Sequence, residues 1–264
     1  MLTIEKVVKY FHKGSINEVL ALSDINLTVP DGDFITVIGS NGAGKSTLLN
    51  CVAGSFFPDF GHIRLKNQDI TGWPEYKRAR YMGRVFQDPL LGTCASLSIE
   101  QNMALARRRG KRRGLKRGVT NDDRDFFRHE LKKIGLGLED RLGDSIGLLS
   151  GGQRQALTLA MAAMADPEIL LLDEHTAALD PKTAHQTIKL TEHLIESRGL
   201  TALMVTHNMN QAIKLGNRLI MLHQGKIILD VAGDAKAELT VNDLLAQFYK
   251  AKGEEFVSDR MLLT

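Results

Sequence analysis

Residues 34–54 read FITVIGSNGAGKSTLLNCVAG, and this stretch decides the fold. It starts with an apolar run typical of a buried strand, passes through a glycine-rich loop and continues with helix-forming residues as far as Gly54. The loop matches the pattern G-x-x-x-x-G-K-[ST], whose backbone N–H groups surround phosphate groups. The stretch therefore predicts a strand, a phosphate-binding loop and a helix over residues 45–53.

Each part of this loop has a physical task. The glycines let the backbone approach phosphate oxygens, the lysine places a positive charge at the β- and γ-phosphates, and the serine hydroxyl is a ligand for Mg²⁺. Ser46 is thus an expected metal ligand. The residues expected to contact the nucleotide are Gly39, Ser40, Asn41, Gly42, Ala43, Gly44, Lys45, Ser46 and Thr47.

A second apolar run ends in two carboxylates. Residues 169–172 read ILLL and lead directly into Asp173 and Glu174. We expect Asp173 to hold Mg²⁺, usually through water, and Glu174 to polarise the attacking water as a general base. A strand end that carries acids by chance is the alternative. The phosphate loop in the same chain favours the catalytic interpretation.

Residues 149–153 read LSGGQ and precede a stretch with helical spacing over 153–165. Ser150 is a suitable helix N-cap, and Gly151 and Gly152 expose backbone N–H groups at the positive end of the helix. This segment predicts a second anion site. Taken alone, it would suit an ordinary helix start equally well.

The composition of the 264 residues, 43% hydrophobic and 25% charged, is that of a soluble globular protein and excludes disordered, collagen-like and coiled-coil classes. Two cysteines exclude a disulfide scaffold. No apolar run approaches the roughly 20 residues that a bilayer requires, and the first residues lack the apolar region of a signal peptide. We expect a cytosolic protein, unless a partner brings it to a membrane.

The net charge of +3 is unevenly distributed, because residues 107–118, RRRGKRRGLKRG, contain eight Lys or Arg and no acid. Contact with anionic lipid head groups or with an acidic loop of a membrane subunit is one interpretation, and a nucleic-acid patch is another. Three glycines in the run favour a third, a solvated flexible loop. The rest of the chain is net acidic, so no nucleic-acid partner is expected.

The remaining pattern predicts an α/β fold. Alternating residues near the N-terminus and at 25–29 and 62–65 predict antiparallel strands, and apolar runs at 202–206 and 219–222 predict buried ones. A hairpin is expected over 219–230, and helical spacing recurs over 124–134. Asp180 and Pro181 are the expected N-cap and first residue of another helix.

Together these motifs resemble the ATP-binding cassette of ABC transporters, over nearly the whole chain. Residues 39–47 look like its Walker A motif, residues 169–174 look like Walker B with the catalytic glutamate, and residues 149–153 are identical to its signature consensus. The motifs stand in the order of the family. Three shorter segments resemble its Q-loop, D-loop and histidine switch: Val85-Phe86-Gln87, Ala178-Leu179-Asp180 and Val205-Thr206-His207.

The resemblance implies a P-loop NTPase core of the RecA type, with an N-terminal antiparallel β subdomain and an inserted α-helical subdomain. We expect a single ABC ATPase domain over residues 1–240, with the helical insertion at about 88–165. A short C-terminal helix and tail would follow over 241–264.

The resemblance also gives roles to individual residues. Glu174 becomes the catalytic base, His207 presents its side chain to the γ-phosphate, and Gln87 senses Mg²⁺ and the membrane partner. Phe11 is expected to stack on adenine, with Tyr10 as the alternative. The signature residues expected to contact ATP are Ser150, Gly151, Gly152 and Gln153. One residue departs from the family, since His175 stands where proline is frequent, and we interpret it as a loop variant.

A further implication is a head-to-tail dimer that closes on ATP and opens after hydrolysis. Each ATP would lie between Lys45, Ser46, Glu174 and His207 of one chain and Ser150, Gly151 and Gly152 of the other.

The resemblance therefore predicts an ATP hydrolase, with ATP and Mg²⁺, that powers transport from the cytoplasmic face of the plasma membrane. Its expected partners are transmembrane permease subunits and, indirectly, an extracytoplasmic solute-binding protein. Uptake of a small, amino-acid-like solute is the favoured activity. Export, lipoprotein release or a division-type complex is the alternative, followed by a soluble ABC ATPase outside transport.

Overall fold

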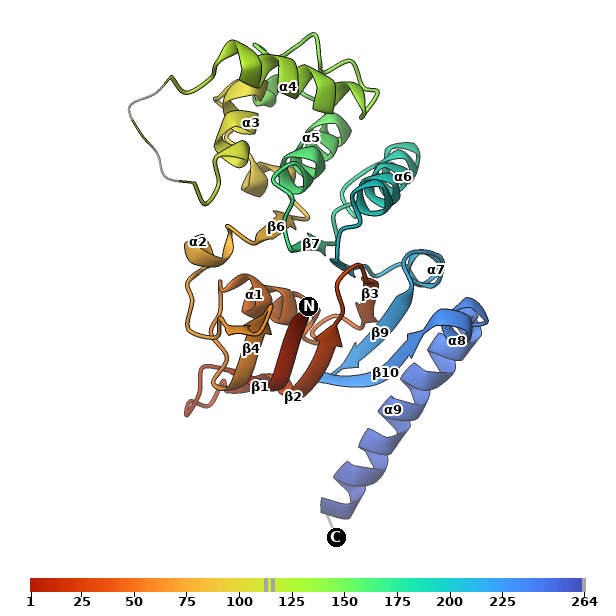
Figure 1. The fold of residues 1–264 in the computed structure, drawn as a ribbon. Helices are drawn as coiled ribbons and strands as arrows, with labels where there is room; N and C mark the ends of the chain where they lie inside the picture. The colour runs from red at the N-terminus through yellow and green to blue at the C-terminus, as the bar shows by residue number, and fades with distance from the viewer. Residues whose placement is uncertain (112–113, 115–116, 263–264) are drawn as a thin grey trace. The chain divides into compact units, whose positions relative to one another are not determined.

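The structure of the chain is a computed structural model that describes the backbone of residues 1–111, 114 and 117–262, and the side chains as far as residue 253. Its helices and strands form two compact units (Figure 1). The first unit contains residues 1–73 and 203–264, and the second contains residues 74–202. The α/β class expected from the sequence is confirmed.

An antiparallel sheet forms the N-terminal part of the first unit, in the order β2-β1-β4-β5. In its register Leu2 lies opposite Val29 on one side and Leu65 on the other. All three of these side chains are buried, as the alternating pattern predicts. The strands are β1 (Leu2–Phe11), β2 (Val19–Val29), β4 (Phe60–Leu65) and β5 (Gln68–Asp69).

A second sheet of this unit has the strand order β10-β9-β3-β8. Strands β3 and β9 pair in parallel, and β9 and β10 form the expected antiparallel hairpin. The residues of β3 before Gly39 are all buried, which explains its continuous apolar run. The strands are β3 (Phe34–Gly39), β8 (Ala202–Val205), β9 (Arg218–His223) and β10 (Lys226–Ala232).

In the sequence, the helices of the first unit come after strands of this second sheet. Helix α1 (Lys45–Ala53) has the predicted bounds and ends at Gly54, whose φ of +83° is left-handed. Helix α9 (Val241–Leu262) has 22 residues, whereas a short helix and tail were expected there. Two short helices complete the unit, α7 (Met209–Lys214) and α8 (Gly233–Ala237).

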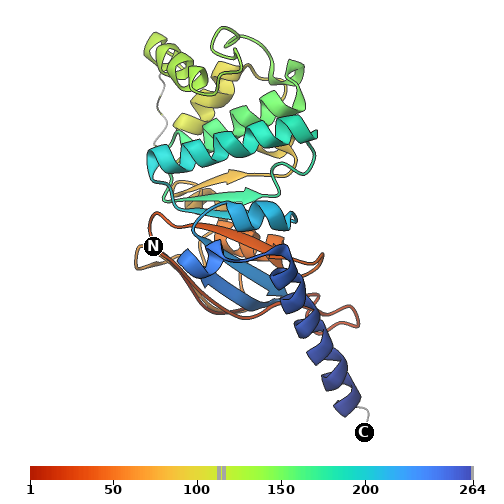
Figure 2. The ribbon, with the colours of Figure 1, turned by 90° about the vertical axis from the view of Figure 1, so that its right-hand side faces the viewer.

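The second unit contains a parallel pair of strands, β6 (Met82–Val85) and β7 (Ile169–Asp173). Helix α6 runs alongside α5 (Figure 2). A separate apolar core, which includes Met103, Phe127 and Leu157, joins α3, α4 and α5. The helices are α2 (Glu75–Arg78), η1 (Pro89–Gly92), α3 (Ile99–Arg107), α4 (Asn121–Lys132), η2 (Ile146–Leu148), α5 (Gly151–Ala163) and α6 (Pro181–Arg198).

These helices fill the segment where an α-helical insertion was predicted. The helical spacing at 124–134 and 153–165 corresponds to α4 and α5, each shifted by two or three residues toward the N-terminus. The predicted N-cap Asp180 and first residue Pro181 of α6 are confirmed. Within the described residues, no helix combines the length and the apolar character that crossing a bilayer would require.

Candidate nucleotide-binding and catalytic site

The phosphate loop connects β3 to α1 in the first unit, and its glycines are required by close backbone contacts. A Cβ at Gly39 would lie 2.3 Å from the carbonyl oxygen of Leu222 in β9. One at Gly44, whose φ is +99°, would lie 2.5 Å from the carbonyl oxygen of Ala21. No other residue type fits either position without moving a strand, so the loop keeps the tight path that brings its N–H groups together.

The lysine of this loop is buried within the loop's own turn, with only 6% of its surface exposed. Lys45 Nζ donates hydrogen bonds to the carbonyl oxygens of Gly39, at 2.9 Å, and Ser40, at 3.0 Å. Its positive charge is therefore fixed at the start of α1, where the helix dipole also favours an anion. Ser46 follows it in the first turn of α1 and is exposed.

His207 emerges beside the strand that carries the phosphate loop. Strand β8 is the neighbour of β3 in the sheet, and the Thr206 N–H donates to the Val37 carbonyl at 3.1 Å. The Thr206 hydroxyl in turn accepts a hydrogen bond from Asn208 N, at 3.1 Å. These bonds fix the backbone on both sides of His207, whose side chain is exposed.

The two aromatic candidates for adenine stacking lie at the end of β1 and are both partly exposed. Phe11 packs edge-on against Phe56, with ring centroids 5.2 Å apart. The Tyr10 ring lies next to the Lys13 ammonium, 5.3 Å from the ring centroid. Stacking of Phe11 on adenine stays a prediction.

In the second unit, β7 carries Asp173 at its end, after four buried residues. Asp173 Oδ2 lies 3.8 Å from Arg84 Nη2 of β6, and this guanidinium also stacks 4.4 Å from the Phe86 ring. Burial lowers the pKa of Arg84, while Asp173 and Glu75 oppose that shift. Arg84 thus places a positive charge beside the predicted metal ligand, and nothing in the sequence around β6 indicates this role.

Glu174, the predicted general base, has a backbone φ of +45°. This left-handed conformation is uncommon for a residue with a Cβ. Its carbonyl accepts a hydrogen bond from Ala177 N, at 3.0 Å, which closes a turn directly after β7. Glu174 therefore lies at the start of a tight turn.

Gln87 lies on a loop that is fixed on both sides. The Gln155 side chain of α5 donates to the Phe86 carbonyl at 3.2 Å, and the Asp88 side chain accepts from Leu90 N at 2.9 Å. Gln87 itself is exposed between these two anchors. The loop thus presents an amide side chain to the solvent at the end of β6, and the role of Gln87 as a sensor of Mg²⁺ and the membrane partner stays a prediction.

The segment 149–153 forms the N-terminus of α5, as predicted. Ser150 Oγ accepts from Gln153 N, and Gln153 Oε1 accepts from Ser150 N, both at 3.2 Å. This reciprocal capping box fixes the first turn of the helix. Ser150 and Gly151 are exposed, so the positive end of α5 is open to an anion.

The residues expected to hold Mg²⁺ carry a set of donors that suits this ion. Ser46, Asp173 and Gln87 supply a hydroxyl, a carboxylate and an amide oxygen, and Mg²⁺ prefers oxygen ligands. The described residues contain no cluster of three or more His, Cys, Asp or Glu side chains that would make a self-sufficient metal cage. The three expected donors suit an ion whose other ligands come from nucleotide phosphates and water.

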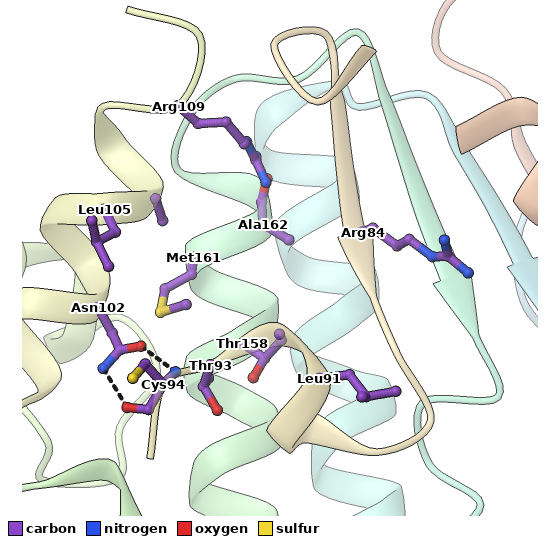
Figure 3. A pocket seen from close by; sticks show the side chains of 12 residues that line it. Arg84, Leu91, Thr93, Cys94, Asn102, Leu105, Arg109, Thr158, Met161 and Ala162 are labelled. Atoms are coloured by element: carbon purple, nitrogen blue, oxygen red, sulfur yellow. Dashed lines mark hydrogen bonds between the residues drawn. The ribbon is translucent and has the colours of Figure 1, made fainter. Parts of the chain in front are cut away.

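A cavity of about 310 Å³ lies in the second unit between η1, α3 and α5 (Figure 3). Asn102 fixes its rim, because its side-chain amide accepts from Cys94 N at 2.8 Å and donates to the Cys94 carbonyl at 3.1 Å. Arg109 donates to the Ala162 carbonyl at 3.4 Å, and burial lowers its pKa. Arg109 forms no ion pair with any carboxylate in the described part of the chain. The cavity is therefore positively charged.

The start of the basic run contributes to the fold. Arg107 and Arg108 both pair with Asp123, at 2.7 and 3.2 Å, and the Arg107 guanidinium also lies over the Phe126 ring. These contacts connect α3 to α4. Residues 112–113 and 115–116 of the basic run at 107–118 lie outside the described residues.

Comparisons with known proteins agree on one family. Residues 22–177 match the family described as ABC transporter. A tyrosine transport ATP-binding protein of Clostridioides difficile (strain R20291) is 44% identical over 248 residues, which is 94% of this chain and 98% of that protein. The thiamine import ATP-binding protein ThiQ of Yersinia pseudotuberculosis serotype I (strain IP32953) is 37% identical, over 78% of this chain and 82% of that protein.

The solved structures that resemble this chain are also ATP-binding cassettes. One is a dimeric post-hydrolysis state of the ATP-binding cassette MJ0796 bound to ADP and Pi. It is 30% identical with a TM-score of 0.75, and the match covers 88% of this chain and 98% of that one. Another, the ADP conformation of the cassette MJ1267, has a TM-score of 0.77 at 25% identity, over 94% of this chain and 98% of that one.

Proposed function

The chain belongs to the ABC transporter family, and we propose that its ATP hydrolysis drives uptake of a small, amino-acid-like solute through separate permease subunits. The observation that carries the proposal is the similarity, over nearly its whole length, to a protein named for tyrosine transport. Proteins named for thiamine and methionine import are also similar. As part of such a complex, the chain would lie peripherally on the cytoplasmic face of the membrane.

The chemistry of the site follows from its charges. Lys45 and the N–H groups of the phosphate loop bind the β- and γ-phosphates, and Glu174 accepts a proton from the attacking water. His207 orients the γ-phosphate. Ser46, Asp173 and Gln87 would hold Mg²⁺, which would supply charge neutralisation at the phosphates when bound.

We propose that two copies of the chain complete the site. The N-terminus of α5 begins at the exposed residues Ser150 and Gly151, followed by Gly152, and would serve as an anion site. It would bind the γ-phosphate of an ATP held by the phosphate loop of the second copy. A similar cassette was solved as a dimer in a post-hydrolysis state, which supports this assembly.

The permease contact is assigned to the cavity between η1, α3 and α5. It lies next to the fixed loop of Gln87, which the family resemblance links to the membrane partner. Its Arg109 guanidinium has no carboxylate partner in the described residues, so an acidic side chain of the permease would satisfy it. Leu91, exposed at 69%, offers an apolar contact at the rim.

Co-purification is the direct test of this function. The tagged chain, expressed in its own host and extracted in mild detergent, should recover a multi-span protein in near-equal amount, identified by mass spectrometry. Ribosomal or DNA-repair proteins instead, with the chain wholly in the soluble fraction, would contradict a transport role and leave the ATPase assignment intact.

Cross-linking through a cysteine of the chain can locate the permease contact. Cys94 is exposed and lines the cavity, whereas Cys51 is buried. A photoactivatable thiol reagent on Cys94 should therefore cross-link to the permease in the purified complex, and Cys94→Ser should abolish the product. A complex that forms without any cross-link through Cys94 would place the contact elsewhere.

A further inference from the structure

His175, directly after the predicted general base, is buried rather than part of a solvated loop. Its side chain has 2% of its surface exposed, and its Nε2 lies 3.0 Å from the hydroxyl oxygen of Thr191 in α6. The Thr191 hydroxyl itself donates to the Thr187 carbonyl, at 2.8 Å. Because that proton is already used, Nε2–H of His175 is the donor and the threonine oxygen is the acceptor.

This hydrogen bond lies next to an unfavourable backbone conformation. Glu174 has a φ of +45°, which persists in proteins only where neighbouring contacts enforce it. The bond from Ala177 N to the Glu174 carbonyl closes the turn from within. The His175 side chain connects the same turn to the middle of α6, 16 residues further along the chain.

The end of the turn is attached to the same helix. The Asp180 side chain accepts hydrogen bonds from Lys182 N and Thr183 N, both at 3.1 Å. The segment 174–180 is thus anchored to α6 by a side chain near each end. Of these two anchors, the one at His175 is adjacent to Glu174, so it acts directly on the backbone that carries that carboxylate.

We propose that His175 is a positioning residue for ATP hydrolysis, which holds the Glu174 backbone in its left-handed turn through the hydrogen bond to Thr191. The inference rests on the assignment of Glu174 as general base under the proposed function. It replaces the interpretation of His175 as a loop variant. Proline, frequent at this position in the family, would have to fix the turn through its ring, because it has no side chain that reaches α6.

Two substitutions remove the bond from opposite sides, and a third keeps it. His175→Phe preserves a buried ring without a donor, Thr191→Val preserves the shape without an acceptor, and Thr191→Ser retains the hydroxyl. We expect the first two to lower kcat by about tenfold to a hundredfold, the range that misplacement of a reacting group produces. KM for ATP and equilibrium ATP binding should change less than about twofold, since the phosphate loop is untouched. Thr191→Ser should remain near wild type.

Combining these substitutions with Glu174→Gln shows whether they lower hydrolysis through the position of Glu174 or through a general loss of structure. If His175 acts through Glu174, then Thr191→Val will not lower the residual hydrolysis of Glu174→Gln any further. Residual rates are measured by release of labelled phosphate, and melting temperatures identify variants that are folded. If Thr191→Val does not fold, His175→Phe gives the same comparison.

Three results would overturn the proposal. The first is a wild-type kcat in both Thr191→Val and His175→Phe, and the second is a kcat in Thr191→Ser as low as that in Thr191→Val. The third is that Thr191→Val lowers the residual rate of Glu174→Gln by the same factor by which it lowers the wild-type rate. Unimpaired hydrolysis by Glu174→Gln itself would instead remove the general-base assignment of the proposed function.

Discussion

A Cβ atom at Gly152 would lie 2.1 Å from the Cγ2 methyl of Thr183, at the start of α6. The next nearest atoms of that threonine, Cβ and Oγ1, would lie at 3.5 and 3.6 Å, which is ordinary contact. The Cγ2 methyl of Thr183 therefore leaves no room for a Cβ at position 152. The two helices that meet there carry the signature segment, residues 149–153, and the turn after β7.

Gly152→Ala should lower ATP hydrolysis and destabilise the fold, because the new methyl group forces the N-terminus of α5 away from α6. Overpacking of this kind costs about 1–3 kcal/mol. Adding Thr183→Ser removes the clashing methyl and should restore much of both properties. Steady-state phosphate release and thermal melting of the single and double variants test this. A double variant no better than Gly152→Ala would contradict the steric explanation.

Glu174→Gln should retain ATP binding and lose hydrolysis by about 10²- to 10⁴-fold, the usual contribution of a general base. The amide keeps the size of the side chain but cannot accept the proton of water. Equilibrium binding of ATP and single-turnover hydrolysis are the measurements. Glu168→Gln, before β7, is a matched control that should hydrolyse normally. Substantial turnover in Glu174→Gln would remove this residue from the role of base.

Lys45→Ala should lose most of its nucleotide affinity, because the buried ammonium is the positive charge fixed by the phosphate loop. Fluorescent ATP-analogue titration measures the change. Lys189→Ala, at an exposed position of α6, removes the same charge elsewhere and should bind normally. Unchanged binding in Lys45→Ala would count against the phosphate-loop assignment.

Ser150→Asp tests separately whether Ser150 caps α5 and whether it contacts the γ-phosphate. Aspartate is as good an N-cap as serine, so the first turn of α5 should remain and the melting temperature should change little. Its negative charge should repel the γ-phosphate, so ATP-dependent dimerisation and hydrolysis should both decrease. Ser150→Asn is the neutral control with the same capping ability. Size-exclusion chromatography with ATP measures the dimer. Equal dimerisation by the aspartate and asparagine variants would argue against a phosphate contact here.

Lys236 should make stability depend on alkaline pH. Its ammonium is buried, donates to the carbonyls of Leu215 and Gly216, and burial lowers its pKa to about 8. The unfolded chain, with a lysine pKa near 10.4, binds more protons between these values, so stability should rise with pH across that window and be lower below pH 8.

The size of that effect is at most about 3 kcal/mol, from 1.36 kcal/mol for each pKa unit. Lys236→Met removes the titration while keeping the length of the side chain. The difference in unfolding free energy between the two proteins, from urea denaturation at pH 7 to 10, should move in favour of the wild type as the pH rises. A difference that stays constant would show that Lys236 titrates normally.

Local signals in the sequence predict several elements correctly. The bounds of α1 follow from a glycine on each side of it, and α6 begins where Asp180 and Pro181 supply a cap and a preset φ. The strands with continuous apolar runs are buried as expected. These features depend on residues within one turn or one strand of each other, which is why sequence alone determines them.

Other features were missed because their causes are weak or distant in the sequence. Helix α3, which begins at a Ser98–Gln101 capping box, was not predicted as a separate element because its first turn is mostly polar. The bond between His175 and Thr191, and the approach of Arg84 to Asp173, join residues 16 and 89 positions apart. No local sequence pattern indicates a contact between residues so far apart. For this reason His175 was interpreted as a loop variant, whereas its contact with Thr191 makes it a candidate for positioning Glu174.

The division of the chain into units has a consequence for biosynthesis. Residues 74–202 form their unit from one continuous stretch, whereas the other unit needs residues from both ends of the chain. Its strand β3 pairs with β9, with Ile35 opposite Arg218. As the chain leaves the ribosome, the internal unit can fold first, while the strand before the phosphate loop waits for a partner made about 180 residues later. Strand β3 is thus synthesised early and paired late, and until then its unpaired apolar edge is a potential site of aggregation.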